Sequence, residues 1–284
     1  GQGPCTLNSI SYATCSTTAN TDQRRRLMLE NPQVGQSFAF VNEVDDGGTS
    51  SYNGMVLSLQ RRASRGATVS ANYTWSHCIS DPFFAGLNGG TGGTTYINPE
   101  DRRADRGNCN TSATDRRHVF NLTGVAQTPQ FNNATLRMLA TGWKLAPILR
   151  IQSGPYLTLT TSSDVALSGI SNQRINQILP TAYGDGSVTK YLNPAAFALP
   201  QVGTIGNSGA GAVRGPGTWQ FDAALSRAFR FGETQRAEIR AEAFNITNSF
   251  RNTNPTTNFN SNIFGQITSA LDPRIMQFAF KYFF

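Results

Sequence analysis

Only a few residues in this chain have the types and spacing that a reaction or a metal site would need. Its two histidines, His77 and His118, flank two cysteines, Cys78 and Cys109. Two imidazoles and two thiolates are a common zinc ligand set, so a metal cluster is one interpretation. The other is a Cys78–Cys109 disulfide with a histidine at the end of each adjoining strand. Because no Cys-x-x-Cys spacing is present, we expect the disulfide, with no metal and no cofactor.

The other two cysteines, Cys5 and Cys15, form a second local pair within the polar residues 1–33. An even number of cysteines in loop-like sequence is typical of disulfides in an oxidising compartment. The sequence therefore predicts a Cys5–Cys15 disulfide. We interpret residues 1–33 as a Cys-bearing loop or a cut N-terminal remnant, and residues 34–284 as the structural unit.

The residue arrangements that mark common enzyme sites are missing from the sequence. It contains no nucleophile elbow, no phosphate-binding loop and no His-Glu-x-x-His. Asp101, Asp105 and Asp115 stand among arginines, where ion pairs or solvent contacts are expected. We predict that the chain is not an enzyme.

Composition points to strands and polar loops. Hydrophobic residues make up 38% and charged residues 14% of the 284 residues, both low for a soluble globular protein. The remainder is rich in Gly, Ser, Thr, Asn and Gln. No stretch approaches the ~18 consecutive apolar residues of a transmembrane helix. The net charge of +7 comes largely from arginine pairs at the ends of strand-like runs, which favours a membrane interface over a nucleic-acid partner.

The last eleven residues, 274–284, alternate with the period of a strand. Gln277, Ala279 and Lys281 share one face, and Phe283 is the exception. The opposite face is almost wholly aromatic and comprises Met276, Phe278, Phe280, Tyr282 and Phe284. A strand of an outer-membrane barrel has this pattern, with the aromatic face toward lipid. The alternative is the last strand of a soluble sandwich with one buried face.

A second strand, 235–245, carries charge on one face. Arg236, Glu238, Arg240 and Glu242 alternate there, opposite alanines and an isoleucine. In a barrel these side chains would face the wet lumen, because an arginine on the lipid face costs ~2–4 kcal/mol near the midplane. The alternative is the solvated face of a soluble sheet.

The whole chain can be divided into strands and connections. Strands are predicted at 51–60, 67–76, 117–127, 139–152, 219–231, 235–245 and 274–284, with weaker ones at 36–44, 156–161 and 263–270. Long loops are predicted at 78–116, 162–218 and 246–262. Pro147 predicts a bulge or a local break. If the last strand descends toward the periplasm, the short connections all fall on the periplasmic side and the long ones all fall outside, as in outer-membrane barrels.

We therefore expect an all-β, antiparallel, up-and-down transmembrane β-barrel. It would be partial, with about 8–10 strands, short periplasmic turns and long extracellular loops. Its location would be the bacterial outer membrane, and its partner the membrane lipid.

Short segments of the chain resemble, in the same order, the C-terminal part of a TonB-dependent receptor of the Oar-like type, a family common in acidobacteria and related soil bacteria. They are Ser51–Gly54, Ala71–Ser76, Asp115–Asn121, Gly142–Trp143, Gln152–Pro155, Asn193–Phe197, Arg214–Gly217, Arg240–Asn248 and Asp272–Phe278. The resemblance implies a barrel of about 22 strands around an N-terminal plug, and energy-coupled uptake through TonB. It also implies that the aromatic final strand serves as the signal that barrel assembly machinery recognises.

This chain departs from the family pattern, because it contains neither a plug nor a TonB-contacting segment. We expect the barrel part of a receptor that imports a bulky nutrient, and contact with TonB only through a missing segment. Two alternatives remain. One is a structural or assembly-forming surface protein, such as an adhesin or fibre subunit at the cell surface. The other is a small self-standing outer-membrane barrel.

Overall fold

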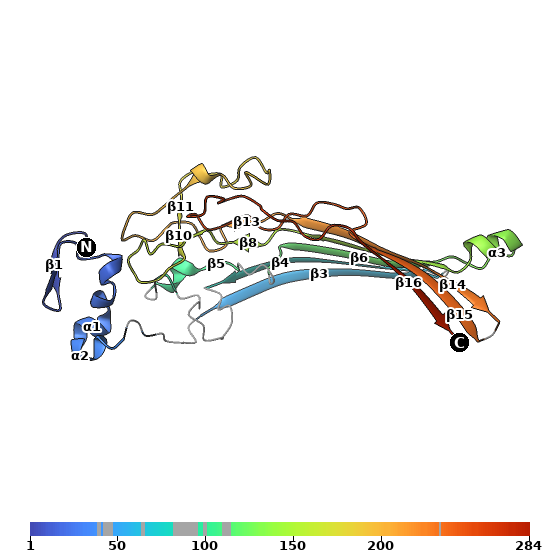
Figure 1. Ribbon diagram of the computed structural model, residues 1–284, viewed down its shortest axis with the longest axis horizontal. Helices are drawn as coiled ribbons and strands as arrows, with labels where there is room; N and C mark the ends of the chain where they lie inside the picture. The colour runs from blue at the N-terminus through green and yellow to red at the C-terminus, as the bar shows by residue number, and fades with distance from the viewer. Residues whose placement is uncertain are drawn as a thin grey trace.

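The computed structural model describes residues 1–38, 41, 48–63, 66–81, 96–98, 101–109, 115–232 and 234–284. The molecule is elongated (Figure 1). One long twisted sheet runs along most of its length, and the long connections and the N-terminal segment gather at one end of the sheet. No helix in the described part of the chain is long and apolar enough to cross a membrane.

The main sheet follows chain order, and each pair of neighbouring strands is antiparallel. Its strands are β3 (Ser50–Ala63), β4 (Ala67–Ser80), β6 (His118–Gln127), β7 (Trp143–Gln152), β14 (Thr218–Phe231), β15 (Gln235–Phe244) and β16 (Ile275–Phe283). The short strand β5 (Gly107–Asn108) adds to β4 beyond the end of β6. This confirms the predicted all-β, up-and-down class. The sheet is not closed into a barrel, since β3 and β16 each pair with one neighbour only.

One face of this sheet is mainly apolar across all seven strands of the path, although Arg227 also lies on it, over the ring of Trp143. Paired residues in neighbouring strands lie on the same face. Phe278 pairs with Ala241, Ala241 with Leu225, and Leu225 with Leu145. Other members of this face are Phe280, Ile239, Phe229, Trp143, Leu149, Ile151, Leu122, Phe120, Tyr73, Leu57 and Leu59. Many of these side chains are exposed, so the described part of the chain leaves much of the apolar side uncovered.

The opposite face is polar and carries its own side-chain hydrogen bonds. Asn121 Nδ2 donates to Asn72 Oδ1 at 2.9 Å, and Arg150 Nε donates to Asn121 Oδ1 at 3.3 Å. Farther along, Gln152 Nε2 donates to Thr218 Oγ1 at 3.0 Å. The alternation of the sequence therefore separates a mainly apolar surface from a mainly polar one, with Ile148 as an exception on the polar face.

Pro147 causes the predicted local break. The pairing between β6 and β7 runs from Val119 to Thr123 and resumes at Ala126, skipping Gly124 and Val125. The register is the same on both sides of the gap, so the chain has a break and no bulge. On its other side Pro147 stays in register with Ala223 of β14.

Short and long connections lie at opposite ends of the sheet, as predicted (Figure 1). The β6–β7 connection differs from prediction because it contains a helix, α3 (Ala134–Ala140). Asn133 caps this helix by accepting from the backbone N–H of Thr135 and of Leu136. Consequently β7 starts at Trp143, and the strand expected from 139 was placed too early.

The hydrophobic core of the molecule lies in the long connections. Its largest fully buried apolar residues are Leu159, Ile175 and Leu192, and Phe197 and Phe264 pack edge to face with ring centroids 5.5 Å apart. Short strands frame this core: β8 (Tyr156–Leu157), β9 (Thr160–Thr161), β10 (Gln173–Arg174), β11 (Asn176–Gln177), β12 (Phe197–Ala198) and β13 (Val213–Arg214). The 3-10 helices η3 (Arg102–Asp105) and η4 (Pro194–Ala196) belong to the same region.

The structure confirms one of the weaker strand predictions and contradicts another. The extended run at 156–161 is present as β8 and β9. The strand expected at 263–270 is wrong, because Phe264 and Ile267 are buried in irregular backbone at the core. The strand expected at 36–44 falls largely outside the described residues.

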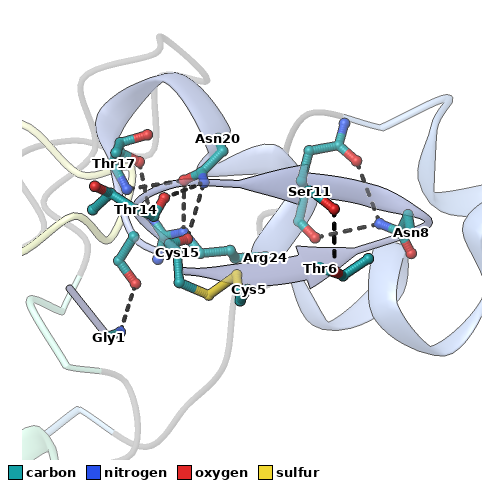
Figure 2. Close-up of a disulfide and its surroundings, with 12 residues drawn as sticks. Gly1, Cys5, Thr6, Asn8, Ser11, Thr14, Cys15, Thr17, Asn20 and Arg24 are labelled. Carbon is teal, nitrogen blue, oxygen red and sulfur yellow. Dashed lines mark hydrogen bonds between the residues drawn. A yellow bond between two sulfur atoms is a disulfide. The ribbon is translucent and has the colours of Figure 1, made fainter. Parts of the chain in front are cut away.

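The N-terminal residues have more structure than the loop that we expected. β1 (Cys5–Leu7) and β2 (Ile10–Tyr12) form a hairpin, followed by η1 (Thr18–Asn20), η2 (Asp22–Arg24), α1 (Arg26–Glu30) and α2 (Pro32–Gly35). Figure 2 shows the Cys5–Cys15 disulfide beside the buried Asn20. Asn20 Nδ2 donates to the Cys15 carbonyl at 2.9 Å. Arg24 connects this segment to the long-loop core by donating to the Leu167 carbonyl at 2.8 Å.

Candidate functional site at the long-loop end

Two arginines and one tyrosine meet where the sheet joins the long connections. Arg117 Nη2 donates to Tyr156 Oη at 2.7 Å, and Arg214 Nη2 donates to the same oxygen at 3.1 Å. Both guanidinium groups also lie over the Tyr156 ring, at 5.9 and 4.5 Å from its centroid. We call these three residues the Arg–Tyr cluster. All three are half-buried, so they remain in contact with solvent.

Backbone pairing explains why these residues meet. Arg117 immediately precedes β6, and its carbonyl accepts from the N–H of Ser76 at 3.0 Å. Tyr156 and Arg214 are register partners in the β8–β13 pair. Two glycines allow that pair to form, because a Cβ on Gly154 would overlap the carbonyl of Gly215.

The cluster carries excess positive charge. Within the described part of the chain, no carboxylate forms an ion pair with Arg117 or Arg214. Arg116 lies next to it, donates to the Ser153 carbonyl at 2.9 Å, and has its pKa lowered by burial. Asp115 is fully buried, and its Oδ2 accepts from the N–H of Cys78 at 3.3 Å. Asp115 therefore directly precedes Arg116 and Arg117 in the chain, and its carboxylate bonds to the backbone of β4.

A buried ion pair connects the first long connection to the second. Arg174 Nη2 lies 3.4 Å from Asp105 Oδ1, and both side chains are less than a tenth exposed. Burial raises the pKa of Asp105 above its ordinary value and lowers the pKa of Arg174. The Asp105 carboxylate also accepts from the N–H of Ile97 at 2.8 Å. This confirms an ion pair for one of the three acids that the sequence placed among arginines.

Both predicted disulfides are present, Cys5–Cys15 and Cys78–Cys109. The second one joins the end of β4 to the residue that follows β5. Its sulfurs are therefore not available as metal ligands. The two histidines bond elsewhere: His77 Nε2 to Asn108 Oδ1 at 2.8 Å, and His118 Nδ1 to Tyr73 Oη at 2.7 Å.

The charged residues predicted to face a lumen do share the polar face. Arg240 Nε lies 2.9 Å from Glu242 Oε1, and Glu238 pairs in register with Lys281 of β16. Arg236 lies over the ring of Phe283, 4.2 Å from its centroid. Phe283, the exception in the aromatic pattern, is therefore accounted for by a cation–π contact on the polar face.

The aromatic residues of the final strand lie at the edge of the sheet. Met276, Phe278, Phe280 and Tyr282 are all exposed, with Phe278 at 76%. Phe284 follows the strand and stacks on Tyr282, with ring centroids 6.2 Å apart. Their role in barrel assembly stays a prediction.

Sequence reasoning did not single out the Arg–Tyr cluster. Tyr156, Arg117 and Arg214 come from separate parts of the chain, and no spacing connects them. The sequence did contain one signal. Arg117 and Arg214 belong to segments that resemble the receptor family, and Tyr156 directly follows such a segment.

Comparison with known proteins is consistent with this geometry. A family described as "Outer membrane beta barrel domain" matches residues 2–277, nearly the whole chain. No curated protein and no solved structure matches at a significant level. The chain therefore belongs to the outer membrane beta barrel domain family, which locates it in the outer membrane.

Proposed function

We propose that this chain is the barrel portion of a TonB-dependent outer-membrane receptor of the Oar-like type, which imports a bulky nutrient. Its long loops would be extracellular and its short turns periplasmic. The observation that carries the proposal is the open sheet: seven strands in one antiparallel path, apolar on one face, with both edges unpaired.

An open sheet of this kind needs more strands. In the hydrocarbon of a membrane, each unsatisfied backbone group costs several kcal/mol, so spanning sheets close. Single-chain bacterial barrels also have an even number of strands, whereas this path has an odd number. The closing strands would come from a further segment or a partner chain. The plug and the contact with TonB would come from the same source.

The polar face supports a wide, wet lumen. Arg240, Glu242, Arg150 and Lys281 all occupy it. A narrow barrel of eight strands would have to fill its interior with side chains, whereas a large transporter barrel holds a separate plug. On the polar face, the Arg240 and Glu242 side chains are 40% and 30% exposed, so these two are not packed into a filled interior.

Segments that resemble the receptor family lie at the junctions between strands and loops. Asn245 is a clear example, since it is almost fully buried with a left-handed φ of 50°. Its N–H donates to Asp222 Oδ1 at 2.7 Å, and its Oδ1 accepts from the N–H of Ser249 at 3.0 Å. This bonding explains why an asparagine directly follows β15, and it supports a strand–loop junction shared with the receptor family.

A second candidate function is favoured by the same free edges. Strands β3 and β16 would pair between copies in a surface assembly, such as a fibre or adhesin. Cysteines placed at Ser58 in β3 and at Ala279 in β16 would then cross-link one copy to another. The receptor proposal expects no such homo-oligomers.

Energy-dependent uptake tests the receptor proposal. Cells that produce this chain together with the segment or partner that supplies the plug would be given a size-graded panel of fluorescent oligosaccharides, peptides and iron chelates, with and without a protonophore. We expect at least one probe to accumulate only in energised cells. Outer-membrane protein that imports none of these probes, or equal accumulation with the protonophore, would contradict the proposal.

A further inference from the structure

We infer that the Arg–Tyr cluster of Arg117, Tyr156 and Arg214 binds an oxyanion, the carboxylate or phosphate group of an acidic ligand. One part of the inference rests on the proposed function, namely that the acidic group belongs to the imported nutrient. Binding itself needs only the folded protein.

The first step is charge. Two guanidinium nitrogens donate to one phenol oxygen, so they cannot be farther apart than those two bond lengths combined. Like charges that close repel each other, and half-burial weakens the screening by water. Since neither arginine forms an ion pair with a described carboxylate, this repulsion is uncompensated within the described protein.

The second step is donor geometry. A guanidinium group has five N–H donors in a planar fork, which matches a carboxylate or phosphate. Tyr156 occupies one Nη2 on each arginine and orients both groups by stacking beneath them. Among the described residues, no other acceptor bonds to these two guanidinium groups, so their remaining donors can bind a ligand. A tyrosine hydroxyl can also donate one hydrogen bond while it accepts from the two arginines.

The third step is preorganisation. Arg214 is held by its backbone, since its N–H donates to Tyr183 Oη at 2.8 Å and its carbonyl accepts from Tyr191 Oη at 3.0 Å. Burial raises the pKa of Tyr191 to about 12, so this phenol stays a donor at neutral pH. The guanidinium group of Arg214 is thus carried by the fixed strand β13, and that of Arg117 by the start of β6 in the main sheet. Because both groups are already positioned, ligand binding costs less conformational entropy.

The experiment measures binding to detergent-solubilised, oxidised full-length protein by titration calorimetry. The probes are inorganic phosphate and D-glucuronate, with glucose as the neutral control, in buffer free of other oxyanions. We expect both anions to bind and glucose not to bind. Arg117→Gln and Arg214→Gln should each weaken binding about tenfold or more, as expected for a lost charge-assisted hydrogen bond.

Two further variants separate binding from folding. Tyr156→Phe removes the phenol oxygen that orients both guanidinium groups and keeps both cations, so it should weaken anion binding, but by less than either Gln variant does. Arg230→Gln removes an exposed arginine near the β14–β15 turn and should bind anions as the wild type does. Heat-modifiable migration in gels checks that each variant is folded.

A parallel arm distinguishes a soluble ligand from a lipid headgroup. Anion binding in detergent supports a soluble acidic ligand. Binding only to vesicles that contain lipopolysaccharide, lost in the two Gln variants, supports the same site filled by lipid phosphate. If neither probe nor vesicle binds, or if the folded Gln variants bind like the wild type, the inference is overturned. Failed uptake with intact anion binding would instead count against the receptor proposal alone.

Discussion

Gly124 of β6 lies against the ring of Pro147 in β7, such that a Cβ on Gly124 would be 3.3 Å from Pro147 Cγ. The pairing between the two strands is interrupted at this point. The glycine therefore makes room for a proline in the middle of a sheet, where proline is otherwise rare. This contact keeps the strand path continuous across the break.

We expect Gly124→Val to destabilise the protein by about 1–3 kcal/mol, because the added methyl groups overpack against Pro147. Urea unfolding of the solubilised protein measures this loss. Gly209→Val is the matched control, since a Cβ there meets nothing within 4 Å. Equal stability of Gly124→Val and wild type would show that the two strands are not in close contact.

The two disulfides should differ in their effect on stability. Cys78 and Cys109 are 31 residues apart, and Cys5 and Cys15 are 10 residues apart. The longer loop loses more entropy on closure, so the Cys78→Ala/Cys109→Ala variant should lose about 3–4 kcal/mol and the Cys5→Ala/Cys15→Ala variant about 2–3 kcal/mol. Parallel unfolding curves of both double variants measure the order. The reverse order would contradict this loop-closure account of the two disulfides.

The Asp105–Arg174 pair allows a test by double-mutant cycle. Asp105→Asn leaves a buried guanidinium group without its carboxylate, and we expect a loss of about 3 kcal/mol or more. Asp105→Asn combined with Arg174→Met removes both charges and should recover most of that loss. Limited proteolysis of the long connections, together with urea unfolding, measures the four proteins. Additive losses would show that the two side chains do not interact.

Asp81 gives a pH dependence with a definite sign. The Thr49 hydroxyl donates to its carboxylate at 2.7 Å, and this bond lowers the pKa of Asp81 below its ordinary value of 3.8 despite partial desolvation. The Thr49 N–H and Arg106 Nη1 lower it further. A carboxyl with a lowered pKa stabilises the fold above pH 3.8, and this contribution is lost as the pH falls toward the folded pKa.

Wild type should therefore lose more stability than Asp81→Asn between pH 5 and pH 3, by about 1 kcal/mol at most because Arg106 remains partly in water. Urea midpoints at the two pH values give the comparison. Curves for the two proteins that stay parallel across this range would exclude the Asp81 contribution.

The sheet could be predicted from the sequence because successive residues of a strand face opposite surfaces, so apolar and polar residues alternate along it. In β16 and β15 the alternation of Phe278 with Gln277, and of Ile239 with Arg240, already separates two faces. Pro147 and the two cysteine pairs were equally local signals. Strand direction then followed from the lengths of the connections.

The long-loop region could not be predicted in the same way. Its core joins Leu159, Ile175, Leu192 and Phe264, which are far apart in the chain and follow no period. Helix α3 depended on the cap by Asn133, in a stretch where we expected only a turn. The Arg–Tyr cluster likewise forms from two connections, with Tyr156 and Arg214 58 residues apart, so only the folded chain brings its residues together.

The central claim is that the apolar face of the sheet contacts lipid and the polar face lines the lumen. Leu225 and Ala224 are neighbours in the middle of β14 and lie on opposite faces. Leu225→Arg should lower the stability of membrane-inserted protein by ~2–4 kcal/mol, seen as a loss of the heat-modifiable band in outer-membrane fractions. Ala224→Arg pairs in register with Glu242 and should leave that band unchanged. Equal bands for the two variants, or a loss confined to Ala224→Arg, would contradict the account.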